Sequence, residues 1–251
     1  MTAMSLTACG SDDDDEDNGG SKYAKELTGK WLVTHSRSKT TDKWMESHSW
    51  KNTYTFNADG KVVGYMDEEK NLRYVEQALS GVPENFSGKM LEVPVGTGVL
   101  TMPVYRELPD AEITCLDYSS DMMAAARKRA EAVGLANITF RQGDVGALPF
   151  EEGSFDVVLC MNGLHVFPNK DKAYSEILRT LKPGGELLAC FYIAGEQKVA
   201  DWLAKTVMTR MGWFTPPFNT ANDVRQRLET YYDILDFHVE GAMLYFKAKK
   251  R

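Results

Sequence analysis

The feature that most constrains the fold is a Gly-x-Gly turn between two short apolar runs. The first run, residues 90–93, includes Glu92 and leads into Gly96-Thr97-Gly98, and the second run, residues 113–116, ends at Asp117, nineteen residues after Gly98. Two acid-bearing strands joined through glycines and a helix-like segment are typical of the start of a βαβ unit. Glycines turn sharply and admit a ligand where a Cβ would block it. The pattern predicts a nucleoside site, with Asp117 accepting both ribose hydroxyls.

Helical and strand-like segments alternate from about residue 67 onward. Strands are expected at 90–93, 113–117, 138–141, 156–161 and 186–193, followed by a closing pair at 232–239 and 242–249. Helices are expected at 68–79, from the glycine turn to about 108, from Ser119 or Ser120 to 133, after Asn169, at 197–211 and at 221–229. This order predicts an α/β, Rossmann-like doubly wound fold. Its seven-stranded sheet is mostly parallel, with an antiparallel C-terminal edge strand.

The first 66 residues differ from the rest. Residues 1–20 are predicted to be a disordered acidic tail, because the six consecutive acids at 12–17 repel one another. Cys9 ends a lipobox-like Leu-Thr-Ala-Cys, but the charged and apolar parts of an export signal are missing, so a cytoplasmic location is expected. Residues 21–66 alternate as strands do and resemble the opening strands of small lipocalin-like lipoproteins. We interpret them as a β-rich fragment too short to close a barrel, and residues 67–251 as the main domain.

Charge and composition exclude several classes of partner. Six of the 36 acidic residues lie in the tail, and the remaining 30 are balanced by 29 basic residues, so no footprint for nucleic acid is expected. The sequence contains no run of 18 apolar residues, so no membrane span is expected. The cysteines at 115, 160 and 190 lie in apolar runs and are expected to be buried, reduced thiols. Neither cysteines nor histidines show metal-ligand spacing, so no metal is expected.

Four segments occur in a specific order. They are Leu-Glu-Val-Pro-Val-Gly-Thr-Gly at 91–98, Leu-Asp-Tyr-Ser at 116–119, Gly-Asp-Val-Gly-Ala-Leu-Pro-Phe at 143–150 leading into Ser-Phe-Asp at 154–156, and Leu-Lys-Pro-Gly-Gly-Glu-Leu at 181–187. Each is weak alone, but the ordered set resembles class I S-adenosylmethionine-dependent methyltransferases. The nearest pattern is the group that includes the ubiquinone and menaquinone pathway enzymes.

The resemblance implies S-adenosylmethionine as cofactor and assigns it to three strand ends. At the first, Glu92 and the backbone from Val93 to Gly98, with Gly96, would hold the methionine part. Pro94 stands there in place of the family's usual glycine. Proline lacks an N–H but tolerates the extended backbone of a strand end.

The other implied contacts follow the next strands. Asp117 would bind the ribose, with Tyr118 and Met122 flanking the adenine. In the Gly143-Asp144-Val145 segment, Asp144 would accept from the adenine amino group while the Val145 N–H contacts the ring. Asn162 and Gly163 would line the cofactor near the reactive methyl group.

The acceptor side is less defined. His165 is a candidate general base, and the alternative is a loop histidine bonded to backbone. An aromatic and proline-rich cluster follows the fifth strand and either covers the acceptor or packs under the last two strands; its members are Trp202, Trp213, Phe214, Pro216, Pro217 and Phe218. The implied reaction is methyl transfer to a small-molecule acceptor, whose identity stays open, as does the oligomeric state.

Two other functions compete with methyl transfer. A catalytically silent S-adenosylmethionine-binding protein would share every cofactor residue. A nicotinamide-dependent oxidoreductase would share the acid at 117. Its Gly-x-Gly-x-x-Gly pattern requires a third glycine at position 101, where this chain has threonine.

Overall fold

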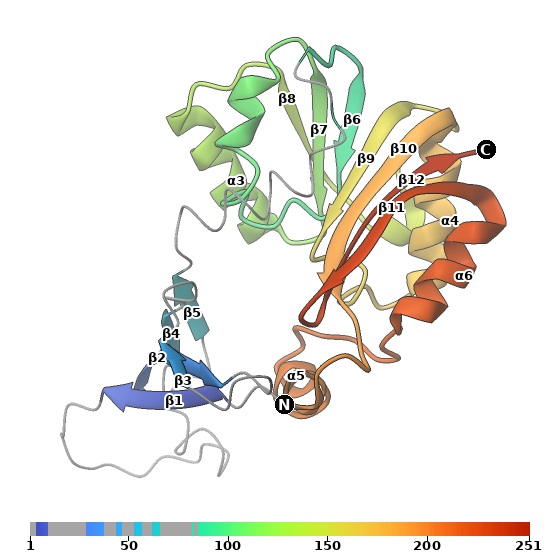
Figure 1. The fold of residues 1–251 in the computed structure, drawn as a ribbon. Coiled ribbons are helices and arrows are strands. Elements are labelled where there is room, and N and C mark those ends of the chain that lie inside the picture. The colour runs from blue at the N-terminus through green and yellow to red at the C-terminus, as the bar shows by residue number, and fades with distance from the viewer. Residues whose placement is uncertain are drawn as a thin grey trace. The chain divides into compact units, whose positions relative to one another are not determined.

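The structure is a computed structural model that describes residues 85–251, Val82 and, nearer the N-terminus, the backbone of five strands (Figure 1). The chain divides into two compact units, Met1–Arg73 and Tyr74–Arg251. The acidic run at 12–17, the expected helix at 68–79 and the expected domain boundary after residue 66 lie outside the described residues.

The N-terminal unit contains an antiparallel sheet. Its strands are β1 (Met4–Cys9), β2 (Gly29–Arg37), β3 (Trp44–Glu46), β4 (Thr53–Phe56) and β5 (Val62–Tyr65), in the order β1-β2-β4-β5, with β3 also pairing with β2. The expected strand character of this region is present in β2, β4 and β5. Met4–Cys9, within the segment expected to be a disordered tail, form β1, and this strand pairs with β2.

The C-terminal unit is built on one seven-stranded sheet. Its strands are β6 (Lys89–Glu92), β7 (Glu112–Asp117), β8 (Ile138–Gln142), β9 (Phe155–Met161), β10 (Leu181–Tyr192), β11 (Tyr232–Glu240) and β12 (Met243–Lys250), in the order β11-β12-β10-β9-β6-β7-β8. β12 runs antiparallel to both of its neighbours, one place in from the edge, and the remaining pairs are parallel. The fold is therefore Rossmann-like, and the strand order reverses between β6 and β9.

Both faces of this sheet are buried. Alternate residues of β9 enter different hydrophobic clusters, with Val158 and Cys160 in one and Val157, Leu159 and Met161 in the other. Helix α3 (Ser120–Ala132) covers one face, whereas α4 (Lys170–Thr180) and α6 (Ala221–Tyr231) cover the other (Figure 1). Burial on both faces explains why β9 is almost continuously apolar.

The expected helix caps are present. The Ser119 side chain accepts the Met122 N–H at the start of α3, and the Asn169 side chain accepts the Lys172 N–H at the start of α4. The helix expected at 197–211 begins as α5 (Lys198–Leu203) and continues into a π-helical stretch, η3 (Ala204–Met208). Two short 3₁₀ helices, η1 (Val104–Glu107) and η2 (Val145–Ala147), complete the helical elements in these described ranges.

The α-helix expected between the glycine turn and residue 108 is not formed. Residues 99–103 instead make successive turns that end in η1. Pro103 supplies no N–H for an α-helical ladder, and the Val104 N–H bonds to Thr101 O at 3.0 Å, with the i→i−3 spacing of a 3₁₀ turn. The glycine turn therefore lacks the regular α-helix N-terminus, with its aligned dipoles, that the pattern predicted.

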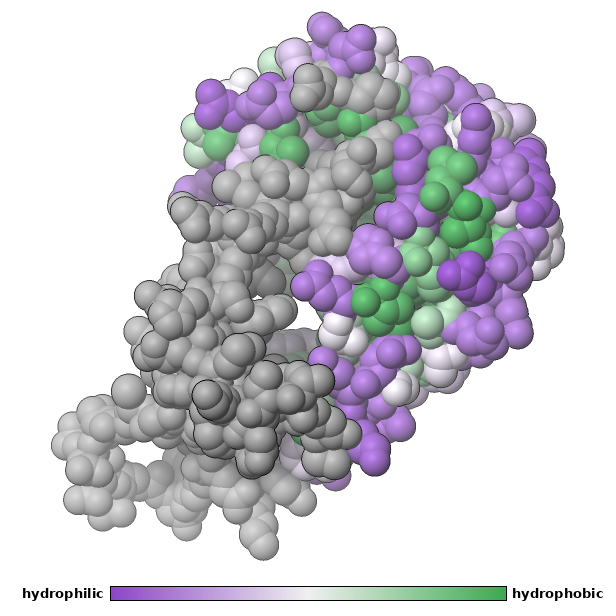
Figure 2. Space-filling view, viewed as in Figure 1, coloured by the Kyte–Doolittle hydropathy of each residue, from purple (hydrophilic) through white to green (hydrophobic). Residues whose placement is uncertain are grey.

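The surface of the described C-terminal unit is mainly hydrophilic, with apolar side chains gathered over β11, where Leu235 and Val239 are exposed (Figure 2). Within the described residues, no helix is both long enough and apolar enough to cross a bilayer. Cys115, Cys160 and Cys190 are buried, as expected.

Candidate functional site

The glycine turn is tied to the end of β7 by the carboxylate of Asp117. Oδ2 accepts the Gly96 N–H at 2.8 Å and Oδ1 accepts the Ser119 N–H at 2.9 Å. Gly96 and Gly98 have φ values of 55° and 66°, which most side chains disfavour. Asp117 therefore fixes the turn, and each carboxylate oxygen has a second lone pair for another donor.

One side of this turn is open. A Cβ placed on Gly96 would meet no atom of the described residues within 4 Å, whereas one on Gly98 would lie 2.8 Å from Met102 Cγ. Beyond Asp117, Tyr118 is 78% exposed and Met122 is 43% exposed. Open space at a left-handed glycine, beside exposed apolar side chains, leaves room for a ligand.

Glu92 lies beneath the turn, in the interior. It is 2% exposed, and its Oε2 accepts hydrogen bonds from Thr101 Oγ1 (3.1 Å), Tyr105 Oη (2.9 Å) and Cys115 Sγ (3.6 Å). Burial raises the Glu92 pKa to about 7, against the opposing effect of the hydrogen bonds from Tyr105, Thr101 and Cys115. Glu92 thus anchors the segment that follows the turn, and its contact with the methionine part stays a prediction.

The segment carrying Asp144 begins beside the end of β7. Gly143 N–H bonds to Asp117 O at 3.0 Å, and Asp144 is exposed, with Oδ1 accepting the Gly146 N–H at 2.8 Å. Val145 is buried in the core, so its side chain anchors η2. The two strand ends therefore bring Asp117 and Asp144 into one neighbourhood.

Two charged residues of α4 hold this segment from below. Glu176 Oε2 accepts the Leu148 N–H at 2.8 Å, while Arg179 donates to the carbonyls of Leu148 (3.1 Å) and Phe150 (2.8 Å). Arg179 also pairs with Glu176 at 2.8 Å. The sequence did not predict these positioning contacts. A glutamate and an arginine at i and i+3 indicate only an ion pair on the surface of a helix.

The end of β9 meets the glycine turn through Pro94 and Gly163. A Cβ on Gly163 would lie 2.5 Å from Pro94 Cδ and 2.6 Å from Phe167 Cζ, so only glycine fits here. Asn162 has φ of 54°, and in the described chain it is the one residue besides glycine with positive φ. Its N–H bonds to Cys190 O at 2.7 Å. The structure thus brings Pro94, Asn162 and Gly163 together, as the resemblance implies.

His165 is buried in an aromatic cluster. Its ring centroid lies 4.2 Å from that of Phe214 and 6.1 Å from that of Tyr192, and Tyr192 also contacts Phe218. Nδ1 is buried and has no hydrogen-bond partner among the described residues. Burial, with a smaller effect of the Lys170 charge, lowers the His165 pKa to about 3. The imidazole is therefore neutral at ordinary pH and a weak base.

Lys170 and Thr215 fasten the aromatic segment over His165. Lys170 Nζ donates to Thr215 O at 2.6 Å, Thr215 Oγ1 donates to Val166 O at 2.8 Å, and Thr215 N–H bonds to His165 O at 3.1 Å. Burial lowers the Lys170 pKa. No local sequence signal connects these residues, which are 45 positions apart along the chain.

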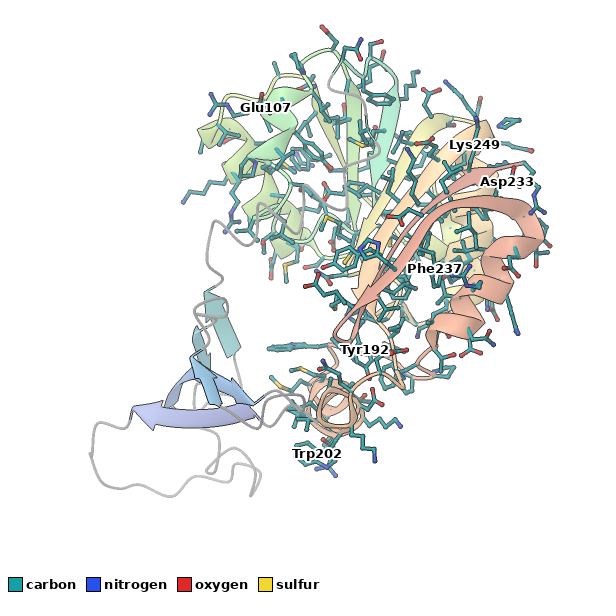
Figure 3. All side chains as sticks on the ribbon, in the orientation of Figure 1. Glu107, Tyr192, Trp202, Asp233, Phe237 and Lys249 are labelled. Atoms are coloured by element: carbon teal, nitrogen blue, oxygen red, sulfur yellow. The ribbon has the colours of Figure 1, made fainter. Side chains whose placement is uncertain are left out.

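The predicted aromatic cluster is only partly assembled. Phe214 and Phe218 pack against Tyr192, but Trp202 is 61% exposed on α5 and Trp213 is 39% exposed. Tyr192 and Trp202 lie on opposite sides of α5 in the view of Figure 3. The predicted member that contacts His165 is therefore Phe214, together with Tyr192, which the sequence analysis did not include.

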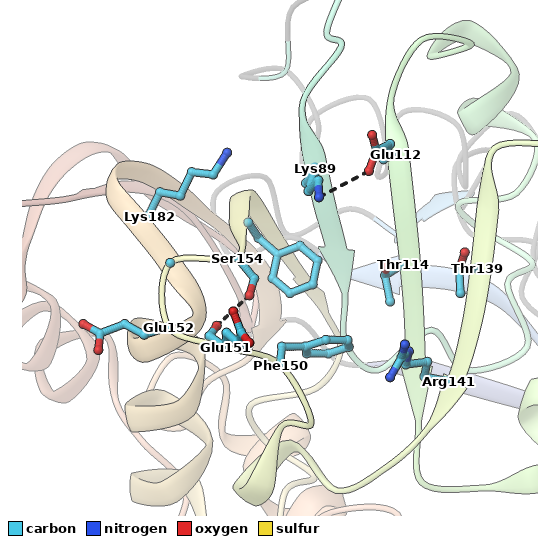
Figure 4. A pocket seen from close by; sticks show the side chains of 12 residues that line it. Lys89, Glu112, Thr114, Thr139, Arg141, Phe150, Glu151, Glu152, Ser154 and Lys182 are labelled. Carbon is cyan, nitrogen blue, oxygen red and sulfur yellow. Dashed lines mark hydrogen bonds and ion pairs between the residues drawn. The ribbon is translucent and has the colours of Figure 1, made fainter.

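A groove of about 510 Å³ lies at the other edge of the sheet (Figure 4). It is lined by Lys89, Glu112 and Phe155, which begin β6, β7 and β9. Ligands of open α/β sheets bind at the carboxyl ends of strands, so this groove is not the predicted site. Within the described ranges, no cluster of three or more histidine, cysteine or carboxylate side chains could hold a metal ion.

Comparison with known proteins agrees with this geometry. Residues 90–185 match the family described as "Methyltransferase domain". The chain is 36% identical over 118 residues to a demethylmenaquinone methyltransferase of Thermus thermophilus, and 35% identical over 111 residues to a phosphatidylethanolamine N-methyltransferase of Cereibacter sphaeroides. These alignments cover 47% and 44% of this chain and 53% of each relative, so the chain spans about half the length of these curated relatives.

A solved structure matches over a larger part of the chain. The crystal structure of the [4+2]-cyclase SpnF has a TM-score of 0.60 at 20% identity, covering 71% of this chain and 80% of that one. At this identity the likeness shows the fold alone.

Proposed function

We propose that the domain containing residues 90–185 is a class I S-adenosylmethionine-dependent methyltransferase, which transfers a methyl group from S-adenosylmethionine to a small-molecule acceptor. The observation that carries the proposal is the joining of three strand ends. Asp117 of β7 holds the Gly96 turn after β6, and Gly163 after β9 packs against Pro94 of the same turn. A cytoplasmic location, where this cofactor is available, is part of the proposal.

The proposed binding residues have distinct tasks. The free lone pairs of Asp117 would take the ribose hydroxyls, and Tyr118 with Met122 would flank the adenine. Asp144, exposed beside the same strand end, would accept from the adenine amino group, and the Val145 N–H would contact the ring. S-adenosylmethionine supplies an already activated methyl group on a sulfonium centre.

Alignment of the acceptor is the protein's remaining task. Correct placement of two reactants contributes roughly 7–11 kcal/mol, so no strong base is needed for an acceptor that is already nucleophilic. With a pKa of about 3, His165 is a poor general base at neutral pH. We propose instead that its neutral ring orients the acceptor by a hydrogen bond.

The aromatic surroundings favour a neutral, ring-bearing acceptor. His165, Tyr192 and Phe214 present ring faces and edges, and the nearby Asp201 carboxylate is engaged by Tyr192 Oη at 2.7 Å and Gly195 N–H at 3.0 Å. The reduced, hydroquinone form of a quinone such as the one named for the Thermus relative fits these properties. The amine headgroup named for the Cereibacter relative is the second acceptor class to test.

Calorimetry and a transfer assay test the proposal. The full chain is titrated with S-adenosylmethionine and, separately, with NADH; binding of NADH alone would overturn the assignment. Methyl transfer is then measured with a demethylated naphthohydroquinone and with phosphatidylethanolamine vesicles. Cofactor binding without transfer to any acceptor of a wider panel would favour a non-catalytic S-adenosylmethionine-binding protein.

A further inference from the structure

The glycine turn holds two of its three peptide groups in place and leaves the third free. The Val95–Gly96 peptide is fixed at both ends, because Gly96 N–H bonds to Asp117 and Val95 O accepts the Gly98 N–H at 3.0 Å. The peptide between them, Gly96 C=O and Thr97 N–H, has no hydrogen bond within the described chain. This middle peptide is therefore the part of the turn available to a ligand.

The second fixed peptide is held from outside the turn. Thr97 O accepts a hydrogen bond from Arg129 Nη1 at 2.8 Å, while the Gly98 N–H of the same peptide bonds to Val95. Arg129 lies in α3 and is half-buried, and its Nη1 also reaches Ala125 O at 3.4 Å. A guanidinium bonded to a carbonyl is a charge-assisted contact, stronger than a neutral one.

Helix α3 is close enough to the turn for this contact to be direct. Ala126, one helical turn before Arg129, is fully buried, and its Cβ lies 3.2 Å from the position of a Cβ on Gly98. Residues at i and i+3 share a helix face, so Ala126 and Arg129 both face the turn. The same α3 begins directly after the Asp117 strand (Figure 1).

We propose that Arg129 is a positioning residue for the cofactor, an inference that rests on the proposed function. Thr97 stands between two left-handed glycines, which allow rotation of the flanking peptides at little steric cost. Without Arg129, the Thr97–Gly98 peptide is held at its N–H end alone, and its carbonyl can turn toward the open side. A carbonyl dipole there repels the carboxylate end of S-adenosylmethionine, whereas the conformation held by Arg129 points it toward α3.

The expected effect is on cofactor affinity. If one loop conformation binds and its population falls to about one tenth, the apparent dissociation constant rises about tenfold. The maximal rate at saturating cofactor changes little, because bound cofactor selects the competent conformation. A residue that served stability alone would change the melting temperature without this separation.

The experiment compares Arg129→Gln and Arg129→Lys with a matched control. Arg127→Gln removes an arginine from the same helix that is exposed and bonds to Phe140 O at 3.4 Å, away from the turn. Amide hydrogen exchange of the ligand-free protein is followed across residues 94–102, and calorimetry gives the affinity for S-adenosylmethionine.

Arg129→Gln is expected to speed exchange in the turn and to weaken cofactor binding about tenfold, with KM for the cofactor raised and kcat within about twofold. Arg129→Lys is expected to recover part of the affinity, and Arg127→Gln to match the wild type. Equal affinity in the Arg129→Gln and Arg127→Gln variants would overturn the inference alone. Absence of cofactor binding by the wild type would instead overturn the proposed function, and with it the cofactor role of Arg129.

Discussion

The two halves of the candidate site are built in different ways. The cofactor half, at the ends of β6, β7 and β8, consists of backbone groups held by short hydrogen bonds, such as Gly96 N–H to Asp117. The acceptor half, around His165, consists of buried rings fastened by Lys170 and Thr215. One half depends on chain geometry within a few residues of each strand end, and the other on side chains from distant segments.

This difference assigns different vulnerabilities to the halves. Backbone turns tolerate changes at most neighbouring positions but fail when a glycine or an accepting carboxylate is lost. A packed aromatic cluster tolerates changes in polarity poorly, because a polar atom without a partner costs free energy in an apolar environment. His165 Nδ1, which has no hydrogen-bond partner in the part of the chain that the structure describes, is such an atom.

The largest effect is expected from Asp117→Ala. The substitution removes the acceptor of two backbone N–H groups, each bond to a charged group contributing about 1.5–3 kcal/mol. We expect cofactor affinity to fall about a hundredfold or more, with the acceptor half unchanged. Calorimetry with S-adenosylmethionine and the fluorescence of an acceptor analogue measure the two halves separately.

The control for Asp117 is Asp121→Asn. Asp121 is an exposed acid in the first turn of α3, so its loss costs only about 0.3–1 kcal/mol of helix stability. Cofactor affinity within twofold of the wild type in Asp117→Ala would show that the adenosyl site lies elsewhere.

Two glycine substitutions are expected to separate binding from folding. Gly96→Ala places a Cβ in open space, so beyond the strain of its positive φ, about 1 kcal/mol, it mainly obstructs the ligand. Gly163→Ala places a Cβ 2.5 Å from Pro94 and 2.7 Å from Cys160 Sγ, and overpacking of this kind costs about 1–3 kcal/mol.

Urea denaturation and calorimetry check this pair. We expect Gly96→Ala to bind S-adenosylmethionine at least tenfold more weakly while losing less stability than Gly163→Ala. The reverse order of stabilities would mean that the space above Gly96 is filled in the folded protein and is not a ligand site.

Much of the cofactor half could be predicted from sequence because its signals are local. A glycine turn, an acid at a strand end and a Ser or Asn cap each specify conformation within four residues, and Ser119 and Asn169 cap as expected. The strand order follows from the alternation of helices and strands. The α-helix expected after Gly98 is the one part of this half that the sequence predicted wrongly. Pro103 interrupts the α-helical hydrogen bonds, so that a 3₁₀ helix forms in its place.

The acceptor half was less predictable because its contacts are not local. A lysine at the start of a helix, such as Lys170, is ordinarily expected to be exposed to solvent. In the structure Lys170 is buried and bonds to Thr215. Trp202 was expected either to cover the acceptor or to pack under the last two strands, and it is exposed on α5. Arg129 likewise carries no local sign that it reaches Thr97, 32 positions earlier. These partners depend on which elements the fold brings together.

The smallest and most diagnostic effects concern pH. The His165 pKa is lowered to about 3 from an ordinary 6.5, so the unfolded chain binds a proton that the folded chain does not between these values. Stability from this group is present above pH 6.5 and is lost as the pH falls toward 3. Glu92 acts oppositely, because its pKa is raised to about 7 from 4.5: its contribution is present below pH 4.5 and is lost as the pH rises through 7.

Each of these two groups makes the unfolding free energy depend on pH, and the two dependences have opposite signs. Replacing a group should therefore remove its own contribution to the pH dependence. His165→Phe is expected to flatten the fall in unfolding free energy as the pH drops from 6.5 to 4. Glu92→Gln is expected to flatten the fall in unfolding free energy as the pH rises from 4.5 to 7. Each effect is expected to be about 1–3 kcal/mol. His238→Asn is the control for the first, since this half-exposed histidine sits beside Asp236 on β11. Urea unfolding across pH 4–8 measures all three variants. Parallel curves for His165→Phe and the wild type would mean that the ring is accessible to water, and the division into a wet cofactor half and a dry acceptor half would fail.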